Sequence, residues 1–277
     1  MLVCEFIDCI LDCKLLKTSV ACSDCCDDVD FVKKIMYDKC HPDHCADLSL
    51  VLIHHACDGS SKVVKLLLDD NREHRALPDT DAGVALGTAA MCGRGAVVKL
   101  LLDDNREHRV LPDAEDSVAL KMAAANGHSE VVKLLLDDNR EHRALPDASN
   151  SEALRLAAYH GRSEVVKLLL DDNREHRALP DEEDSYALRL AANYGHSEVV
   201  KLLLDDNREH RALPDARGSY ALIWAAIYGH SEVVKLLLND NREHRANAND
   251  REALRIAKQH GHTAVVKLLR GNRGDRP

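Results

Sequence analysis

Residues 187–204 read ALRLAANYGHSEVVKLLL, and the second half of this stretch recurs along most of the chain. The string VVKLL begins at seven positions: Val63, Val97, Val131, Val165, Val199, Val233 and Val265. Successive copies are 34 residues apart five times and then 32 apart. A fixed period of this length is typical of a protein whose units stack on one another. We therefore predict a tandem array of seven units over residues 47–270, followed by a disordered tail at 271–277.

The unit at residues 151–184 shows the local structure that we expect of every copy. Ser151 is placed to cap a first helix over 152–160, and Ser163 to cap a second helix over 165–170, because a serine oxygen can accept from the free N–H groups of a first turn. Both helices are shorter than the roughly 12 residues at which isolated helices become marginally stable. Stability must therefore come from neighbouring units, which predicts an all-α solenoid.

The same stretch resembles the helical half of the ankyrin repeat, with its Leu-x-Leu-Ala-Ala, Gly-His and Glu-Val-Val-Lys-Leu-Leu-Leu segments. The resemblance extends over about residues 47–270. It implies a curved helix-turn-helix solenoid of seven to eight repeats, hairpin-like loops between them, and a concave face that binds a protein partner. The chain departs from the family pattern in its period of 34 rather than about 33 residues. It also replaces the Thr-Pro-Leu-His start by pairs such as Tyr186-Ala187, followed by Leu and usually Arg.

The composition narrows the classes of function. Only nine residues are aromatic (two Phe, one Trp and six Tyr), although 45% of the chain is hydrophobic, so the core must consist mainly of Ala, Val and Leu. The net charge of −10 argues against a general affinity for nucleic acid or for an anionic membrane. No apolar run approaches the roughly 20 residues that span a bilayer. Residues 1–8 lack the basic start of a secretory signal, which favours an intracellular location, in the cytoplasm or the nucleus.

Motifs that would indicate catalysis are absent: the sequence has no Gly-rich phosphate loop, no His-Glu-x-x-His pattern and no nucleophile elbow. We interpret a histidine that recurs in six units as a column of stacked loop side chains, since a metal site would need acidic or thiol co-ligands. These histidines are His74, His108, His142, His176, His210 and His244. We expect a monomeric, non-enzymatic protein that needs no cofactor.

The N-terminal segment, residues 1–46, differs from the array in its cysteines. All ten cysteines of the chain lie at or before Cys92, which favours free thiols over a disulfide framework. Five residues have a spacing compatible with a structural zinc site: Cys22, Cys25, Cys40, His44 and Cys45. The competing interpretation is a degenerate capping repeat in which the cysteines are small buried residues. A two-part adaptor therefore stays open, in which this segment binds zinc or docks an effector while the array selects the target.

Comparison of the units with one another locates a candidate binding face. Residues that are identical in all copies form the stack, whereas the two ends of the first helix and the loop tips before it vary, so we expect these positions to be free of stacking contacts. Five of the six tyrosines fall at such positions, and tyrosine is frequent in protein interfaces. The predicted partner-binding residues are Glu152, Tyr159, His160, Tyr186, Asn193, Tyr194, Tyr220, Ile227 and Tyr228.

One further expectation concerns the core, and one alternative concerns the function of the whole array. Trp224 occupies the position that Leu156 and Leu190 hold in the two preceding units, so we expect it to pack in the core. An array that serves a purely structural purpose, without any specific partner, is the remaining alternative to a protein-binding function.

Overall fold

The computed structural model describes residues 48–69, 83–104, 109–138, 143–172, 176–206, 211–239, 246 and 251–274. Within these ranges the chain forms fourteen helices and no strand. The helices are α3 (Leu48–Asp58), α4 (Ser61–Leu68), α5 (Val84–Met91), α6 (Gly95–Asp103), α7 (Ala114–Asn126), α8 (Ser129–Leu136), α9 (Ala148–Tyr159), α10 (Ser163–Asp171), α11 (Glu182–Asn193), α12 (Ser197–Asp205), α13 (Ala216–Tyr228), α14 (Ser231–Asn239), α15 (Arg251–Gln259) and α16 (Thr263–Gly274).

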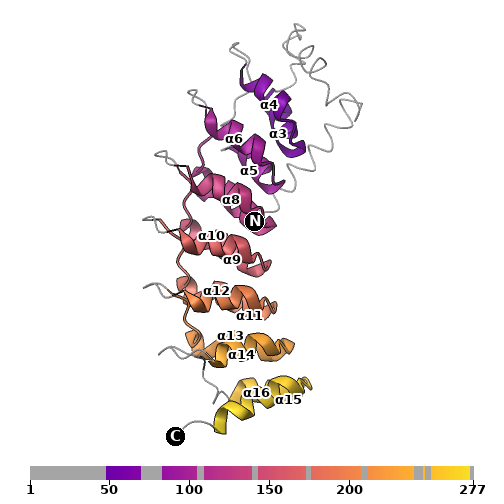
Figure 1. The fold of residues 1–277 in the computed structure, drawn as a ribbon, viewed down its shortest axis with the longest axis vertical. Coiled ribbons are helices and arrows are strands. Elements are labelled where there is room, and N and C mark those ends of the chain that lie inside the picture. The colour runs from indigo at the N-terminus through magenta and orange to yellow at the C-terminus, as the bar shows by residue number, and fades with distance from the viewer. Residues whose placement is uncertain are drawn as a thin grey trace.

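The helices form pairs that stack along one axis, as the rungs of a ladder do (Figure 1). The first helices of the pairs, the odd-numbered ones, each contact the next first helix, and the even-numbered second helices do the same. Each pair therefore adds one level to two continuous layers of helices. This arrangement confirms the predicted all-α solenoid of stacked helix-turn-helix units.

A thin aliphatic core lies between the two layers. Each level buries a leucine from its first helix and at least one from its second; in α11 and α12 these are Leu188 and Leu203, both fully buried. Ala191 and Ala192, also fully buried, occupy the inner side of α11. Small side chains at these positions let adjacent first helices approach closely, while each buried leucine contributes about 1.5–3 kcal/mol of transfer free energy. A core built in this way explains why so few aromatic residues are needed.

The turn between the two helices of a pair depends on glycine and on the following repeat. Gly195 has a φ of +75°, and a Cβ atom placed on it would lie 2.6 Å from Nδ1 of His230, one repeat further on. The Nε2 atom of His230 donates a hydrogen bond to the carbonyl of Asn193 at 3.0 Å. Glycine thus provides both the left-handed conformation and the space for a side chain that links two repeats.

The start of the first helix differs from the prediction. We expected Ser151 to cap a helix over 152–160, but α9 begins at Ala148 with a left-handed turn over residues 149–151. The hydroxyl of Ser151 accepts the backbone N–H of Leu179 in the next repeat at 2.8 Å, so its side chain serves the contact between repeats. The same bond joins Ser117 to Leu145 and Ser185 to Leu213 at 2.8 Å.

Several predicted features fall outside the described residues. They are the degenerate capping repeat within 1–46 and the zinc candidates Cys22, Cys25, Cys40, His44 and Cys45.

At the other end, α16 continues to Gly274, past the end of the array that we expected at residue 270. Among the described helices, none is long and apolar enough to cross a membrane.

Candidate functional site

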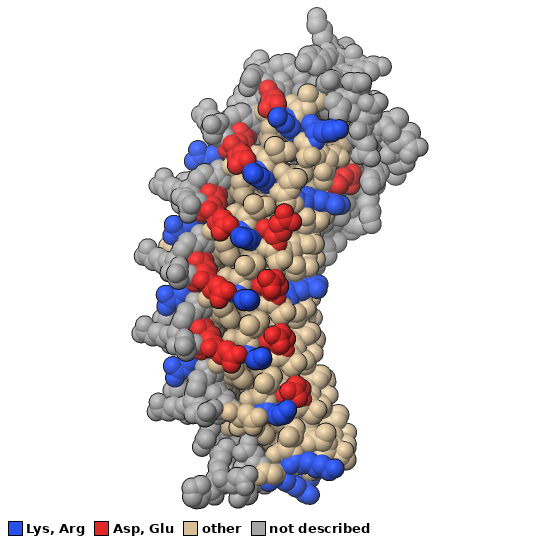
Figure 2. Space-filling view, viewed as in Figure 1, with Lys and Arg blue, Asp and Glu red and all other residues tan. Residues whose placement is uncertain are grey.

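The array has two faces of different character. On the second-helix face, formed by the even-numbered helices, the same acidic and basic side chains return from level to level between α8 and α14 (Figure 2). An exposed lysine has the same place in the four successive second helices α8, α10, α12 and α14, and an exposed glutamate precedes it by three residues. These lysines are Lys133, Lys167, Lys201 and Lys235. The repetition gives this face a uniform, solvated surface.

The first-helix face, formed by the odd-numbered helices, carries the large exposed apolar side chains. Among the described residues these are Tyr159 (37% exposed), Tyr194 (46%), Tyr220 (42%) and Tyr228 (58%). They come from the three successive helices α9, α11 and α13. The structure thus brings four of the predicted binding residues to the surface, in adjacent repeats.

Tyr159, His160 and Tyr194, together with Tyr228, form the group that we call the helix-end cluster, at the C-terminal ends of α9, α11 and α13. The rings of Tyr159 and Tyr194 meet edge to face, with their centres 4.5 Å apart. The ring of His160 also meets the ring of Tyr159 edge to face, with 4.6 Å between the centres. A hydrogen bond with Tyr159 raises the pKa of Tyr194. Burial and the nearby charge of Arg162 lower the pKa of His160, which favours the neutral imidazole over the charged form.

Histidines of the following turns support these rings. His196 stacks on Tyr194 at 6.3 Å, and its Nε2 atom donates to the carbonyl of Tyr159 at 2.9 Å. His230 stacks on Tyr228 at 6.1 Å in the same way. The side chains of the predicted residues Asn193 and Ile227 are half-buried. Their backbone carbonyls accept hydrogen bonds from His230 and His262, so these residues contribute to the contact between repeats through their backbone.

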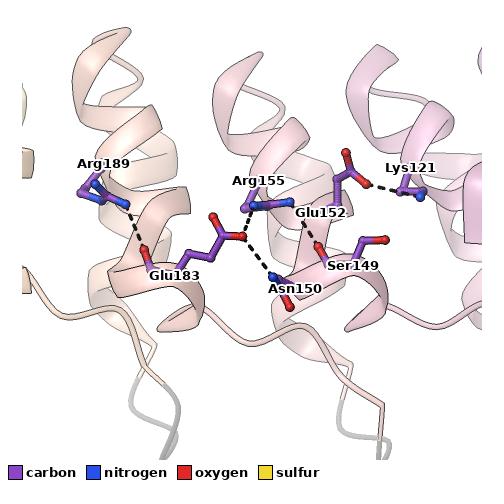
Figure 3. A network of polar contacts seen from close by, with 7 residues as sticks. All are labelled: Lys121, Ser149, Asn150, Glu152, Arg155, Glu183 and Arg189. Atoms are coloured by element: carbon purple, nitrogen blue, oxygen red, sulfur yellow. Dashed lines mark hydrogen bonds and ion pairs between the residues drawn. The ribbon is translucent and has the colours of Figure 1, made fainter. Parts of the chain in front are cut away.

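A ladder of polar contacts crosses the first-helix face near the other ends of the helices (Figure 3). Glu152, a predicted binding residue, forms an ion pair of 3.3 Å with the buried Lys121 of the preceding repeat. Arg155 pairs with Glu183 of the following repeat at 2.8 Å. Asn150 also donates to Glu183, at 3.1 Å, and this bond, together with Arg155, lowers the pKa of that carboxyl. The ladder joins three repeats through contacts that the sequence pattern did not reveal.

Arg155, Tyr186, Arg189, Tyr220 and Trp224 form a second group, which we call the arginine cluster. The guanidinium of Arg189 lies 4.8 Å from the centre of the Tyr186 ring and 6.0 Å from that of Trp224. Arg155 approaches the same Tyr186 ring at 5.8 Å, and Tyr220 meets Trp224 edge to face at 6.5 Å. Cations within about 6 Å of an aromatic ring are attracted by its quadrupole, so the cluster holds its own shape.

Trp224 corrects the prediction that it packs in the core. Its side chain is half-buried and lies beside Tyr220 and Arg189. Leu156 and Leu190, the equivalent residues, are half-buried as well. The position therefore faces the surface of the first-helix layer, and a large ring there extends the apolar area of that face.

The loop tips correct a second expectation. They vary between repeats, yet they are not free of stacking contacts. Ser149 donates to Asp116 of the preceding repeat at 3.1 Å, and Arg217 donates to Asp184 at 2.7 Å. In the part of the chain that the structure describes, the tips before α7, α9, α11 and α13 thus have polar contacts with their neighbours, although their sequences vary.

Comparison with known families agrees with this architecture. A family model described as Ankyrin repeats (3 copies) matches residues 108–184 and 188–276, more than half of the chain. The chain belongs to the ankyrin repeat family. Ankyrin repeats are in general modules for protein–protein interaction and in general not enzymes. No curated protein matches the chain.

The residues that the prediction missed have a traceable signal. Lys121, Arg155 and Arg189 stand where the ankyrin pattern has its histidine, directly after the buried leucine of the first helix. Arg255 has the same place in the last repeat, whereas Ile53, Gly87 and Ile223 occupy it in the three other repeats. Three successive cations at a position next to the core indicate that acceptors lie close by. The identity of those acceptors depends on residues 28 to 31 positions further on, which no local pattern shows.

The cysteines and histidines of the described residues give no metal site of three or more ligands. Cys57 and Cys92 belong to adjacent repeats and are not joined by a disulfide; their Sγ atoms lie 3.0 Å apart. Of the recurring loop histidines only His176 lies within the described ranges, and its Nδ1 atom is 3.0 Å from a carboxylate oxygen of Asp147. This contact fits the interpretation of stacked loop side chains.

Proposed function

We propose that this ankyrin array binds a partner protein through its first-helix face, centred on the helix-end cluster and the arginine cluster. The observation that carries the proposal is the concentration of exposed tyrosines on one face of three adjacent repeats: Tyr159, Tyr194, Tyr220 and Tyr228. Residues equivalent to these in other repeats are of other types, so the site is particular to this part of the array.

Physical chemistry favours such a face for recognition. Tyrosine offers a large apolar ring and a hydroxyl with only two rotatable bonds, which keeps the entropic cost of binding low. Here the stacking of His196 on Tyr194 and of His230 on Tyr228 restrains the rings further. Because the partner meets side chains that are already ordered, less conformational entropy is lost on association.

The setting that we propose is inside a cell, in the cytoplasm or the nucleus, where the array acts as a monomer and without a cofactor. All ten cysteines lie at or before Cys92, a distribution that favours thiols over a disulfide framework and so supports a reducing compartment. A partner that is a protein, rather than a nucleic acid, fits the net charge of −10.

The test compares two triple variants in affinity capture from the native cells, with bound proteins identified by mass spectrometry. Tyr186→Ala, Tyr194→Ala and Tyr220→Ala together remove apolar area from the first-helix face. The matched control, Lys167→Ala with Lys201→Ala and Lys235→Ala, changes the second-helix face at similar levels of the stack. We expect the tyrosine variant to lose the proteins that the wild type enriches and the lysine variant to keep them, with equal helical content. Retention of the same proteins by the tyrosine variant would refute the assigned face.

A further inference from the structure

Arg189 interrupts the ladder of ion pairs on the first-helix face. In the two preceding repeats the equivalent cation has an acidic partner in the next repeat: Lys121 has Glu152, and Arg155 has Glu183. The residues that correspond to these two acids one repeat further on are Tyr220 and Arg217. Arg217 is itself a cation and pairs with Asp184 at 2.7 Å. The two positions that provide a carboxylate for Lys121 and for Arg155 therefore provide none for Arg189.

The surroundings of Arg189 leave its charge only partly compensated. Its side chain is 7% exposed, and its Nη2 atom donates to the backbone carbonyl of Glu183 at 2.9 Å. Its Nε atom is buried and has no acceptor among the described residues, which also contain no carboxylate in an ion pair with it. A buried donor without an acceptor loses its hydration without compensation, and the loss is larger when the group is charged. Burial and the positive charge of Arg217 lower the pKa of this guanidinium, and the nearby charges of Asp184 and Glu183 offset this only in part.

The walls around the guanidinium are aromatic. Tyr186 and Trp224 flank it, and both rings are half-buried, so the cluster reaches the surface of the face. Tyr220, 42% exposed, continues this wall outward from Trp224. An approaching ligand would therefore meet apolar rings beside one incompletely paired cation.

We propose that Arg189 is the anchor for a carboxylate of the partner, supplied by an Asp or Glu side chain. The segment that carries this acid has an apolar residue beside it, which packs on Tyr220 and Trp224. The inference rests on the proposed function and names the chemistry that the first-helix face selects. A hydrogen bond between a carboxylate and a guanidinium is stronger than one between neutral groups, so the acid contributes specificity as well as affinity.

The probe is a phage-displayed library of random short peptides, selected on the full-length chain. The tightest recovered peptide and its amide counterpart, with Asn for Asp or Gln for Glu, are then titrated against the wild type and four variants. Tyr220→Ala removes apolar area from the first-helix face. Arg189→Gln removes the anchor. Arg217→Glu places an acid at the position equivalent to Glu183, where it pairs with Arg189 inside the chain. Arg217→Gln is the matched control, since it removes the same exposed arginine without supplying an acid.

We expect the recovered peptides to share an acid next to an apolar residue, and the amide counterpart to bind the wild type about tenfold more weakly or worse. The ratio of the Kd of the amide counterpart to the Kd of the acidic peptide should fall to near one in Arg189→Gln and in Arg217→Glu. It should keep its wild-type value in Arg217→Gln. Because residue 217 is exposed, the result does not depend on whether Arg189→Gln folds.

Two other outcomes overturn the inference and separate it from the proposed function. If peptides bind and lose affinity with Tyr220→Ala, but show no acid preference or keep it in Arg189→Gln and Arg217→Glu, the anchor is wrong while the binding face stands. If no recovered peptide depends on the tyrosines of the first-helix face, both the anchor and the face are wrong.

Discussion

The second-helix face repeats one arrangement of side chains from α8 to α14, whereas the first-helix face changes at each level. Lys167 and Lys201 have the same neighbours in sequence, so a partner that binds one level of that face would bind the next equally well. Tyr186 and Glu152, by contrast, occupy the same position in adjacent repeats. One scaffold thus separates two tasks: the uniform face keeps the array solvated, and the varied face can distinguish one set of levels from the others.

The largest effect tests whether the first-helix face can be altered without damage to the core. Leu188 and Leu190 lie two residues apart in α11, the former fully buried and the latter half-buried on the first-helix face. We expect Leu188→Ala to lower the free energy of unfolding in urea by about 3 kcal/mol, because it leaves a cavity. Leu190→Ala should cost about 1 kcal/mol. Equal losses in the two variants would show that face and core are not separable.

The next effect concerns the turn that joins the two faces. Gly195→Ala forces a side chain into a left-handed conformation and toward His230, whereas Gly218→Ala meets the first penalty alone, since nothing lies within 4 Å of it. The left-handed conformation costs about 1–2 kcal/mol. We expect Gly195→Ala to lose more unfolding free energy than Gly218→Ala, and the double variant Gly195→Ala with His230→Ala to recover part of the difference. Loss of equal size in both glycine variants would argue that the histidine contact carries no energy.

The smallest effect is a dependence on pH that only the first-helix face should show, since the second helices from α4 to α16 contain no histidine. The pKa of His160 is lowered below its ordinary value of 6.5 in the folded chain. The unfolded chain therefore binds the proton more readily, and stability falls as the pH drops through 6.5 toward the folded pKa. We expect His160→Asn to lose slightly less stability than the wild type between pH 7.5 and pH 5. An NMR titration midpoint of His160 at or above 6.5 would contradict the assignment.

The stack was predictable because its determinants are local and repeated. The VVKLL string, the glycine of each turn and the paired alanines sit at fixed spacing, and each of them acts through helix geometry. The choice of first-helix residues for the binding face rested on the same regularity, since any residue that varies against a constant background is visible in one sequence.

The remaining features depend on which groups of the next repeat lie opposite a residue. Trp224 has the same helical position as Leu190, and both side chains are half-buried. The periodicity of apolar residues does not distinguish such a position from one in the core. Ser151 has the composition of a helix cap, but its hydroxyl binds Leu179, 28 residues away. The incomplete pairing of Arg189 likewise follows from residues 217 and 220, which gain meaning only when the levels are superposed.

The bond between a serine hydroxyl and the leucine N–H of the next repeat also bears on how such a gene can change length. Ser117, Ser151 and Ser185 make this bond at the same separation in the chain, and His196 and His230 bridge carbonyls in the same manner. Unequal recombination that adds or removes one whole unit therefore joins two surfaces that already fit each other. These bonds are the same at each such junction, so a unit added or removed outside α9 to α13 would move the cluster around Arg189 nearer to or further from one end of the array and leave its contacts in place.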